Sequence, residues 1–186
     1  MLKSDTNSRF ARLLALICVA ILLSTAPCWA QQQKAKSATE PAARTLGIVL
    51  YDGFELLDVY GPAEMFGNVG KALDVVMIAE KAGEVTSAQG PVTVAKYGFD
   101  DCPHLDIVLV PGGIGTLREL RNETMLNFLR EKSEDAEIVS SVCSGSAILA
   151  KAGLLDGYRA TSNKVYFSLA ENNGPEVEWV KEARWV

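Results

Sequence analysis

The sequence predicts an α/β domain in which helices cover both faces of a mostly parallel β-sheet. Two observations support this fold class. Short apolar runs rich in valine and isoleucine are typical of strands buried on both faces, and stretches with the apolar spacing of helices alternate with them. The composition is that of a globular protein, with 48% hydrophobic and 22% charged residues, and a length of 186 residues suits one domain with a core.

Four apolar runs mark the expected strands. They are residues 46–51, 73–79, 105–110 and 137–142. Apolar residues at helical spacing predict helices between and after these strands, over residues 58–69, 122–132 and 144–152. Between the second and third strands, residues 84–97 contain Gly90-Pro91 and predict a small hairpin.

The N-terminus has the pattern of a secretory signal peptide over residues 1–30. A basic start with Lys3, Arg9 and Arg12 precedes an uninterrupted apolar run over residues 13–23. That run is shorter than the roughly 20 residues that a membrane-spanning helix needs. We expect a cleaved signal, a secreted or periplasmic location and no stable membrane association after cleavage. An uncleaved N-terminal anchor is the alternative.

Residues 31–45 are polar and predict a flexible linker, which leaves residues 46–186 as the folded domain. The formal net charge of −5 argues against a surface that binds nucleic acid. One histidine and four cysteines are too few for a histidine-built metal site or a disulfide framework. A small-molecule substrate is therefore the expected partner of the domain.

Cys143 is the strongest candidate for chemistry. It follows the fourth expected strand and precedes a helix, within Val142-Cys143-Ser144-Gly145. A small residue two positions after a nucleophile allows the sharp turn of a nucleophile elbow. The start of the following helix is expected to favour the thiolate. The alternative is a buried structural cysteine, because free cysteine is among the most buried residue types.

A glycine-rich loop, Pro111 to Thr116, follows the third expected strand. The backbone N–H groups of Gly112 and Gly113, together with that of Ser144, are expected to bind developing negative charge or substrate. A dinucleotide-binding loop is excluded because Arg118 stands where the third glycine would be. A simple tight turn is the other interpretation.

Asp58 lies beyond the first strand, near the start of a helix. Its carboxyl group either caps that helix or acts as proton donor and acceptor beside Cys143, with Glu55 as a competitor on spacing alone. His104 precedes the third strand, about 20 Å from its far end, so it cannot serve Cys143 as a base. The same distance argues against a disulfide between Cys102 and Cys143.

Four segments, taken in order, resemble the ThiJ/PfpI superfamily and, within it, the isonitrile hydratase-like branch. They are Leu50 to Asp58 with Gly61-Pro62, Val110 to Gly115, Ser141 to Ser146, and Leu149 to Gly157 followed by Arg159 to Thr161. The resemblance implies a flavodoxin-like, three-layer fold, a homodimer, and no metal or cofactor. It also implies that Cys143 is the nucleophile and Asp58 its acidic partner.

The chain departs from this pattern in two places. Asn163 stands where many relatives have a histidine, and asparagine can donate a hydrogen bond but cannot take a proton. The chain stops at Val186, before a strand end and a helix that relatives have. We therefore expect a domain that is incomplete at its C-terminus and that exposes part of its sheet.

The resemblance implies a cysteine-dependent hydro-lyase that converts an isonitrile into an N-substituted formamide. We also expect Asn163 to be among the residues that bind the substrate. The alternative is a non-catalytic domain that senses oxidants or electrophiles through Cys143, or that binds a ligand. A deglycase or glyoxalase activity is a third possibility that Asn163 makes less favourable.

Overall fold

The computed structural model describes residues 43–186, so the predicted signal peptide and nearly all of the predicted linker lie outside the described residues. The central sheet has four parallel strands in the order β2-β1-β5-β6. Their bounds are Arg44–Val49 for β1, Leu73–Ile78 for β2, Ile107–Val110 for β5 and Ile138–Ser141 for β6. All four strands match expected runs, which confirms the predicted fold class.

The register places the ends of the strands level with one another. Leu46 of β1 pairs with Val75 of β2 on one side and with Ile107 of β5 on the other, and Val108 pairs with Val139 of β6. The carboxyl ends of all four strands therefore meet at one edge of the sheet. In open parallel sheets this edge is where ligands bind.

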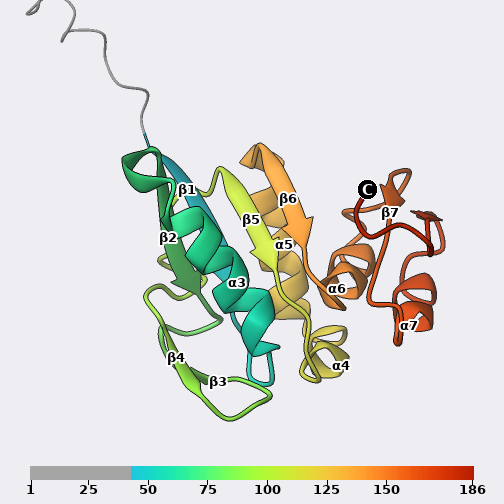
Figure 1. Ribbon diagram of the computed structural model, residues 1–186, viewed down its shortest axis with the longest axis horizontal. Helices are drawn as coiled ribbons and strands as arrows, with labels where there is room; N and C mark the ends of the chain where they lie inside the picture. Colours follow the sequence, from blue (N-terminus) through green and yellow to red (C-terminus); the bar gives the residue numbers. More distant parts are fainter. Residues whose placement is uncertain (1–42) are drawn as a thin grey trace, which may run out of the picture. The chain divides into compact units, whose positions relative to one another are not determined.

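Helices cover both faces of the sheet, as predicted. Helix α3 (Leu56–Gly67) lies on one face, and α5 (Glu123–Asp135) lies on the other, in contact with α6 (Gly145–Lys151) (Figure 1). The side chain of Asn122 caps α5 by accepting a hydrogen bond of 3.3 Å from the N–H of Met125. The buried stripe of α5 is turned toward the sheet and consists of Met125, Leu126, Phe128 and Leu129.

The predicted hairpin is present as β3 (Gly83–Thr86) and β4 (Val92–Ala95), which pair antiparallel. It is tied to the loop after β1, because Gly53 donates a backbone hydrogen bond of 2.7 Å to Thr86. The hairpin thus helps to hold the segment that leads into α3.

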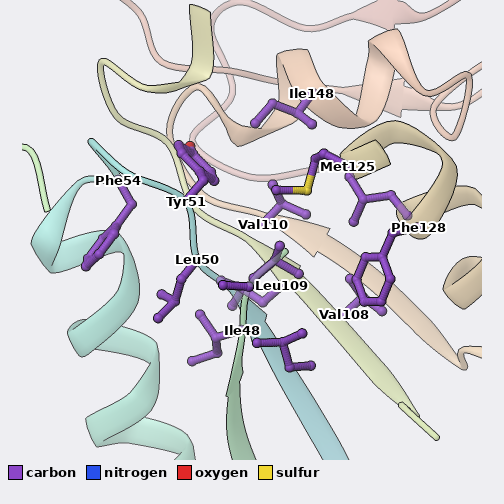
Figure 2. Close-up of a cluster of buried hydrophobic side chains, with 14 of the residues drawn as sticks. Ile48, Leu50, Tyr51, Phe54, Val108, Leu109, Val110, Met125, Phe128 and Ile148 are labelled. Atoms are coloured by element: carbon purple, nitrogen blue, oxygen red, sulfur yellow. The ribbon is translucent and has the colours of Figure 1, made fainter. Parts of the chain in front are cut away.

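The main core lies between the sheet and its helices. Figure 2 shows Ile48 and Leu50 from the β1 segment near Leu109 of β5, while Val108 and Val110 of β5 lie near Met125 and Phe128 of α5, with Ile148 contributed by α6. Each of these side chains is buried, and full burial of such a side chain stabilises the fold by about 1.5–3 kcal/mol.

Several short elements have no counterpart in the expected pattern. Apolar periodicity does not reveal elements of two to five residues, because one turn or one residue pair contains no repeat. These elements are η1 (Gly70–Ala72), α4 (Thr116–Glu119), β7 (Arg159–Ala160), α7 (Phe167–Glu171) and β8 (Glu178–Trp179).

Strand β6 differs from the prediction that it is buried on both faces. Within residues 43–186 it pairs only with β5, and Ile138 is 51% exposed. A cavity of about 850 Å³ runs along β6 and is lined on its other side by residues that include Tyr158 and Val186. The expectation of a domain incomplete at its C-terminus stays a prediction.

Over residues 43–186, no helix is long and apolar enough to span a membrane.

Candidate active site

Cys143 occupies a sharp turn between β6 and α6. Its φ of 56° makes it the one non-glycine residue with positive φ among residues 43–186. The turn is possible because Gly145 packs against β5, where an added Cβ would collide with the Val110 carbonyl oxygen. A Cβ on Gly112 would lie 2.8 Å from the Cβ of Cys143. Strain of this kind at a cysteine is typical of functional sites.

Asn163 holds the sulfur from a loop after β7. Its Nδ2 donates a hydrogen bond of 3.0 Å to Sγ of Cys143, and its backbone N–H donates one of 3.2 Å to the Cys143 carbonyl. The orientation of the amide is settled by its other end, because Oδ1 accepts from the N–H groups of Val165 and Tyr166 at 2.9 and 3.1 Å. The NH₂ group therefore faces the sulfur.

Asp58 lies in the first turn of α3 but does not cap that helix. Its Oδ2 accepts a hydrogen bond of 2.9 Å from the N–H of Gly112, and Gly112 itself packs against Cys143, so the carboxyl group and the thiol are close enough for each to affect the pKa of the other. Burial raises the pKa of Asp58 above its usual value, while the N–H of Gly112 and the thiol of Cys143 lower it. A half-buried carboxyl beside a thiol is placed to exchange a proton with it.

Glu55, the competitor for this role, faces elsewhere. Its Oε2 accepts a hydrogen bond of 2.6 Å from Nε2 of Gln89 in the hairpin. The Oε1 of Gln89 accepts from the N–H of Leu56 at 3.0 Å, so the hairpin caps α3 in place of Glu55. Glu55 acts on the site only through the repulsion that raises the pKa of Asp58.

Burial and a neighbouring charge act against the thiolate that the start of α6 is expected to favour at Cys143. The pKa of Cys143 is raised above its usual value, first by burial and then by the negative charge of Asp58. Hydrogen bonds from Asn163 and Ser144 oppose this rise without reversing it. Since each anion disfavours the other, the thiol and the carboxyl titrate as a coupled pair.

The backbone N–H groups of the glycine-rich loop donate hydrogen bonds to side chains of the site. The N–H of Gly112 donates to Asp58, and the N–H of Gly113 donates a hydrogen bond of 3.2 Å to Oγ of Ser144. Both donors therefore hold side chains of the site. The backbone N–H of Ser144 is the one that acts on the Cys143 sulfur, where it lowers the pKa of the thiol. The binding of developing charge by Gly112 and Gly113 stays a prediction.

Sequence reasoning missed two buried hydroxyl groups next to the site. Tyr51 donates a hydrogen bond of 2.6 Å to the Pro111 carbonyl, and its oxygen lies 3.1 Å from Oγ1 of Thr116. Oγ1 of Thr116 lies 3.0 Å from Oγ of Ser144. Tyr51 is the last residue of an expected strand and Thr116 ends the glycine-rich loop after another, which was the available signal, but single hydroxyl residues form no recognisable motif.

The opposite edge of the sheet holds the residues that were expected to be remote. Nε2 of His104 lies 3.4 Å from Oδ1 of Asp106, whose Oδ2 accepts from the N–H of Thr45 at the start of β1. Cys102 and Cys143 are both free thiols. In the part of the chain that the structure describes, no cluster of histidine, cysteine and acidic side chains could hold a metal ion.

Cys143 is a strained cysteine at a strand-to-helix turn of a parallel α/β sheet, and a carboxyl group from the first helix lies near it. These are the features of an α/β domain with a cysteine at a nucleophile elbow. The sequence profile of the DJ-1/PfpI family matches residues 44–184. The chain belongs to this family.

Individual relatives have different activities. Isonitrile hydratase from Pseudomonas putida is 35% identical over 132 residues, covering 71% of this chain and 58% of the hydratase. A deglycase from Thermococcus kodakarensis is 29% identical and covers 75% of this chain and 86% of the deglycase. An HTH-type transcriptional regulator from Pseudomonas aeruginosa is 28% identical over 62% of this chain and 32% of the regulator.

Among solved structures, a ThiJ/PfpI family protein from Pseudomonas syringae superposes with a TM-score of 0.69 at 33% identity. The match covers 81% of this chain and 62% of that protein. This chain thus spans less than two thirds of the length of both the hydratase and the P. syringae protein.

Proposed function

We propose that the protein is a cysteine-dependent enzyme of the isonitrile hydratase type, which adds water to an isonitrile and releases an N-substituted formamide. The observation that carries the proposal is the placement of the Cys143 thiol against Asp58 on one side and the NH₂ group of Asn163 on the other. This site offers a nucleophile and one proton-transferring group, and the reaction needs no more than these. The 35% identity with isonitrile hydratase supports the substrate class.

In the first step the sulfur of Cys143 attacks the terminal carbon of the isonitrile. The thiol proton, taken up by Asp58, is delivered to that carbon, which gives a thioimidate with a new C–S bond. The raised pKa of Asp58 favours its protonated form, which can donate this proton. The amide of Asn163 and the N–H of Ser144 stabilise negative charge on the sulfur before the bond forms.

In the second step water adds to the thioimidate carbon. The carboxylate of Asp58 accepts a proton from the water, and the substrate nitrogen is protonated as the tetrahedral intermediate forms. Cleavage of the C–S bond then releases the formamide and returns the proton to Cys143. One isonitrile and one water give one formamide, and no histidine is required. The only histidine of the chain, His104, lies at the other edge of the sheet.

The proposal is tested by incubating the full chain with a panel of small alkyl and aryl isonitriles and following formamide production by NMR. We expect turnover in the parent protein and none in Cys143→Ala, with the fold of the variant checked by circular dichroism. Turnover that survives the loss of Cys143, or a folded parent protein inactive on the whole panel, contradicts the proposal.

A second candidate function is ligand binding without turnover, and the similarity to an HTH-type transcriptional regulator favours it. In that case Cys143 reacts with an electrophile or an oxidant and stays modified. Mass spectrometry after mild peroxide treatment separates the two functions. Stoichiometric oxidation of Cys143 in a chain that turns over no isonitrile supports sensing.

We further infer that the domain forms a homodimer through α3 and β4. Apolar side chains are exposed on both elements, among them Leu57, Met65 and Val94, which are 74%, 73% and 64% exposed. A hydrogen bond of 2.9 Å between Tyr60 and Thr93 joins the two elements into one surface. Light scattering should show a dimer that Met65→Glu weakens, and a monomeric parent protein would contradict this inference.

The secreted or periplasmic location rests on the signal-peptide pattern of residues 1–30. Expression of the full chain followed by cell fractionation tests it. The expected result is a shortened chain outside the cytoplasm, and a full-length chain retained in the cytoplasm contradicts it.

A further inference from the structure

The turn of the β3–β4 hairpin contacts the segment that leads into the candidate site. Figure 1 shows the hairpin at the end of the molecule where α3 begins. The N–H of Ala88 in this turn donates a hydrogen bond of 2.8 Å to the carbonyl of Phe54, which is fully buried. Phe54 also forms one bridge with Ser87 of the turn and another with Gly113 of the glycine-rich loop. The entry to α3 is therefore held between the hairpin and that loop.

The hairpin turn is closed by its own hydrogen bonds, so it presents Gln89 from a fixed place. The N–H and the hydroxyl of Ser87 both donate to the carbonyl of Pro91, at 2.9 and 2.8 Å. Gly90, whose φ of 99° is in the region that favours glycine, donates to the carbonyl of Ser87 at 3.1 Å. Gln89 lies within this closed turn.

The amide of Gln89 binds two neighbouring residues at the start of α3. Its Nε2 donates a hydrogen bond of 2.6 Å to Oε2 of Glu55, and its Oε1 accepts one of 3.0 Å from the N–H of Leu56. A carboxylate can only accept and an N–H can only donate, so these partners settle the orientation of the amide. Glu55 occupies the N-cap position, but its own side chain makes no capping hydrogen bond.

Asp58 lies three residues after Glu55, in the same helical turn. In a capping box, an acid at the position of Asp58 accepts from the N–H at the position of Glu55. Here that N–H donates instead to the carbonyl of Gly112 at 2.7 Å, and Oδ2 of Asp58 accepts from the N–H of Gly112 at 2.9 Å. A Cβ on Gly112 would lie 2.8 Å from the Cβ of Cys143, so the residue that binds Asp58 packs against the cysteine.

We propose that Gln89 is a positioning residue, which holds the Glu55 carboxylate in the hairpin so that Asp58 faces Gly112 and Cys143 without Glu55 beside it. Without the amide of Gln89, Glu55 is free to move toward the N–H groups at the start of α3, which attract anions. Two negative charges then lie in one helical turn near the sulfur. Such charges disfavour both the thiolate and the carboxylate of Asp58.

Few titratable groups act on Asp58 and Cys143, so the effect of Glu55 can be isolated. The charges that act on Asp58 are those of Glu55 and the thiol, and the charge that acts on the thiol is that of Asp58. Tyr51 is affected by both, but burial raises its pKa and keeps the phenol neutral. Replacing the neutral Gln89 by alanine removes no charge, so a shift in the titration of the sulfur reports where Glu55 has moved.

The experiment measures the pH midpoint of Cys143 alkylation by iodoacetamide in the full chain, read by mass spectrometry of the peptide that carries Cys143. Gln89→Ala is expected to raise the midpoint by about half a pH unit, because a negative charge moves closer to the sulfur. The thiolate fraction well below the midpoint then falls about threefold. Gln89→Glu sets two carboxylates against each other and should raise the midpoint at least as far. Circular dichroism checks that both variants fold.

Changes at Glu55 separate positioning from a merely structural role. In a Glu55→Gln background, Gln89→Ala should not raise the midpoint, since no second charge remains to be released. Glu55→Gln combined with Gln89→Glu exchanges donor and acceptor. The new amide can donate to the new carboxylate, whose other oxygen can still accept from Leu56, so the midpoint should return to the parent value.

Three results overturn the proposal. They are single variants whose midpoints do not rise, a rise with Gln89→Ala that persists in the Glu55→Gln background, and a combined exchange variant whose midpoint stays as high as that of Gln89→Glu. The first shows that Gln89 does not hold a charge away from the sulfur. The other two show that its loss acts through the fold of the turn rather than through Glu55.

This inference rests on the proposed function, because it explains how Asp58 is kept as the acid of that site. Alkylation of Cys143 is nevertheless independent of isonitrile turnover. An inactive parent protein with the expected midpoint shifts refutes the proposed activity alone. An active parent protein without those shifts refutes the role of Gln89 alone.

Discussion

The two cysteines of the described domain, Cys102 and Cys143, form a natural comparison. Both are free and half-buried, and burial is the largest cause of a raised pKa at both. Cys102 lies near the amino ends of the strands, where its thiol lies 3.3 Å from the Pro103 carbonyl oxygen and Lys132 lowers its pKa. Cys143 lies at the carboxyl ends and has Asp58 and Asn163 beside its sulfur.

The comparison shows that neither burial nor ease of ionisation distinguishes the candidate nucleophile. Cys102 even has a cation near its sulfur, which Cys143 lacks among the groups that act on it. Acids act on both sulfurs, since Asp101 and Glu131 raise the pKa of Cys102 and Asp58 raises that of Cys143. What distinguishes Cys143 is a strained backbone, with φ of 56°, at the carboxyl edge of the sheet, together with the amide of Asn163 at its sulfur.

The largest expected effect therefore separates the two thiols by activity. Cys143→Ala should abolish isonitrile turnover because the covalent step loses its nucleophile, while Cys102→Ala should retain the parent rate. Formamide production measured by NMR on both variants checks this. Loss of activity in both variants, with folds intact, would remove the distinction on which the proposed site rests.

The next largest effect is expected when Asp58, the acid near Cys143, is replaced. Asp58→Asn keeps an acceptor for the N–H of Gly112 but cannot take a proton, so turnover should fall by about 10²–10⁴-fold. Alkylation of Cys143 should become faster at neutral pH, because the negative charge that raises its pKa is gone. Steady-state kinetics should show slower turnover and alkylation rates should show faster modification of Cys143, both measured on one sample. Slower alkylation would contradict the coupling.

A smaller effect concerns the stability of the turn itself. Gly145→Ala places a Cβ against the Val110 carbonyl and should lower the free energy of unfolding by about 1–3 kcal/mol, as overpacking in a rigid core does. Gly61→Ala is the matched control, because a Cβ there meets nothing within 4 Å in α3, and it should be neutral or stabilising by about 0.5–1 kcal/mol. Urea unfolding of both variants checks this, and equal losses would contradict the close packing of the turn.

The smallest effect compares carboxyl groups at the two edges of the sheet. The pKa of Asp58 is raised in the folded state, so the folded protein binds the extra proton and stability falls as pH rises from the usual value of 3.8 through the folded value. The pKa of Asp106 is lowered, chiefly by the N–H of Thr45, so its contribution is present above that usual value and is lost as pH falls through the folded value.

The two asparagine variants should consequently differ in sign. At neutral pH, Asp58→Asn should raise the unfolding midpoint and Asp106→Asn should lower it, and both differences should shrink in acid. Thermal unfolding at neutral and acid pH measures them. A stabilising effect of Asp106→Asn at neutral pH would contradict the assignment of Thr45 as its main partner.

Much of the fold could be predicted because local patterns agree with the tertiary structure. The four parallel strands and the hairpin follow from apolar runs and turn residues, since strands in such sheets must be apolar along their length. The prediction was wrong for the burial of β6, because a strand's position at the edge of a sheet depends on its neighbours rather than on its own residues. The short α4 contains too few residues for a periodic signal.

At the site, the sequence pointed to Cys143 and Asp58 because each stands just beyond a strand, and parallel strands bring such positions to one edge. It could not show that Gln89 binds the carboxyl group of Glu55, so that Asp58 is the acid near the sulfur, since that depends on a contact with the hairpin. It also could not show that burial and the charge of Asp58 raise the pKa of Cys143, because both arise only in the folded chain.

The sequence alone determines that the protein has an α/β architecture, a cysteine followed by small residues after a strand, and an acid after the first strand. Only the tertiary structure decides the surroundings of that sulfur, through burial, the charge of Asp58 and the fixed amide of Asn163. The reason is physical. Hydrophobic periodicity is a property of neighbouring residues, whereas the state of a proton depends on atoms that are brought within about 3 Å from distant parts of the chain.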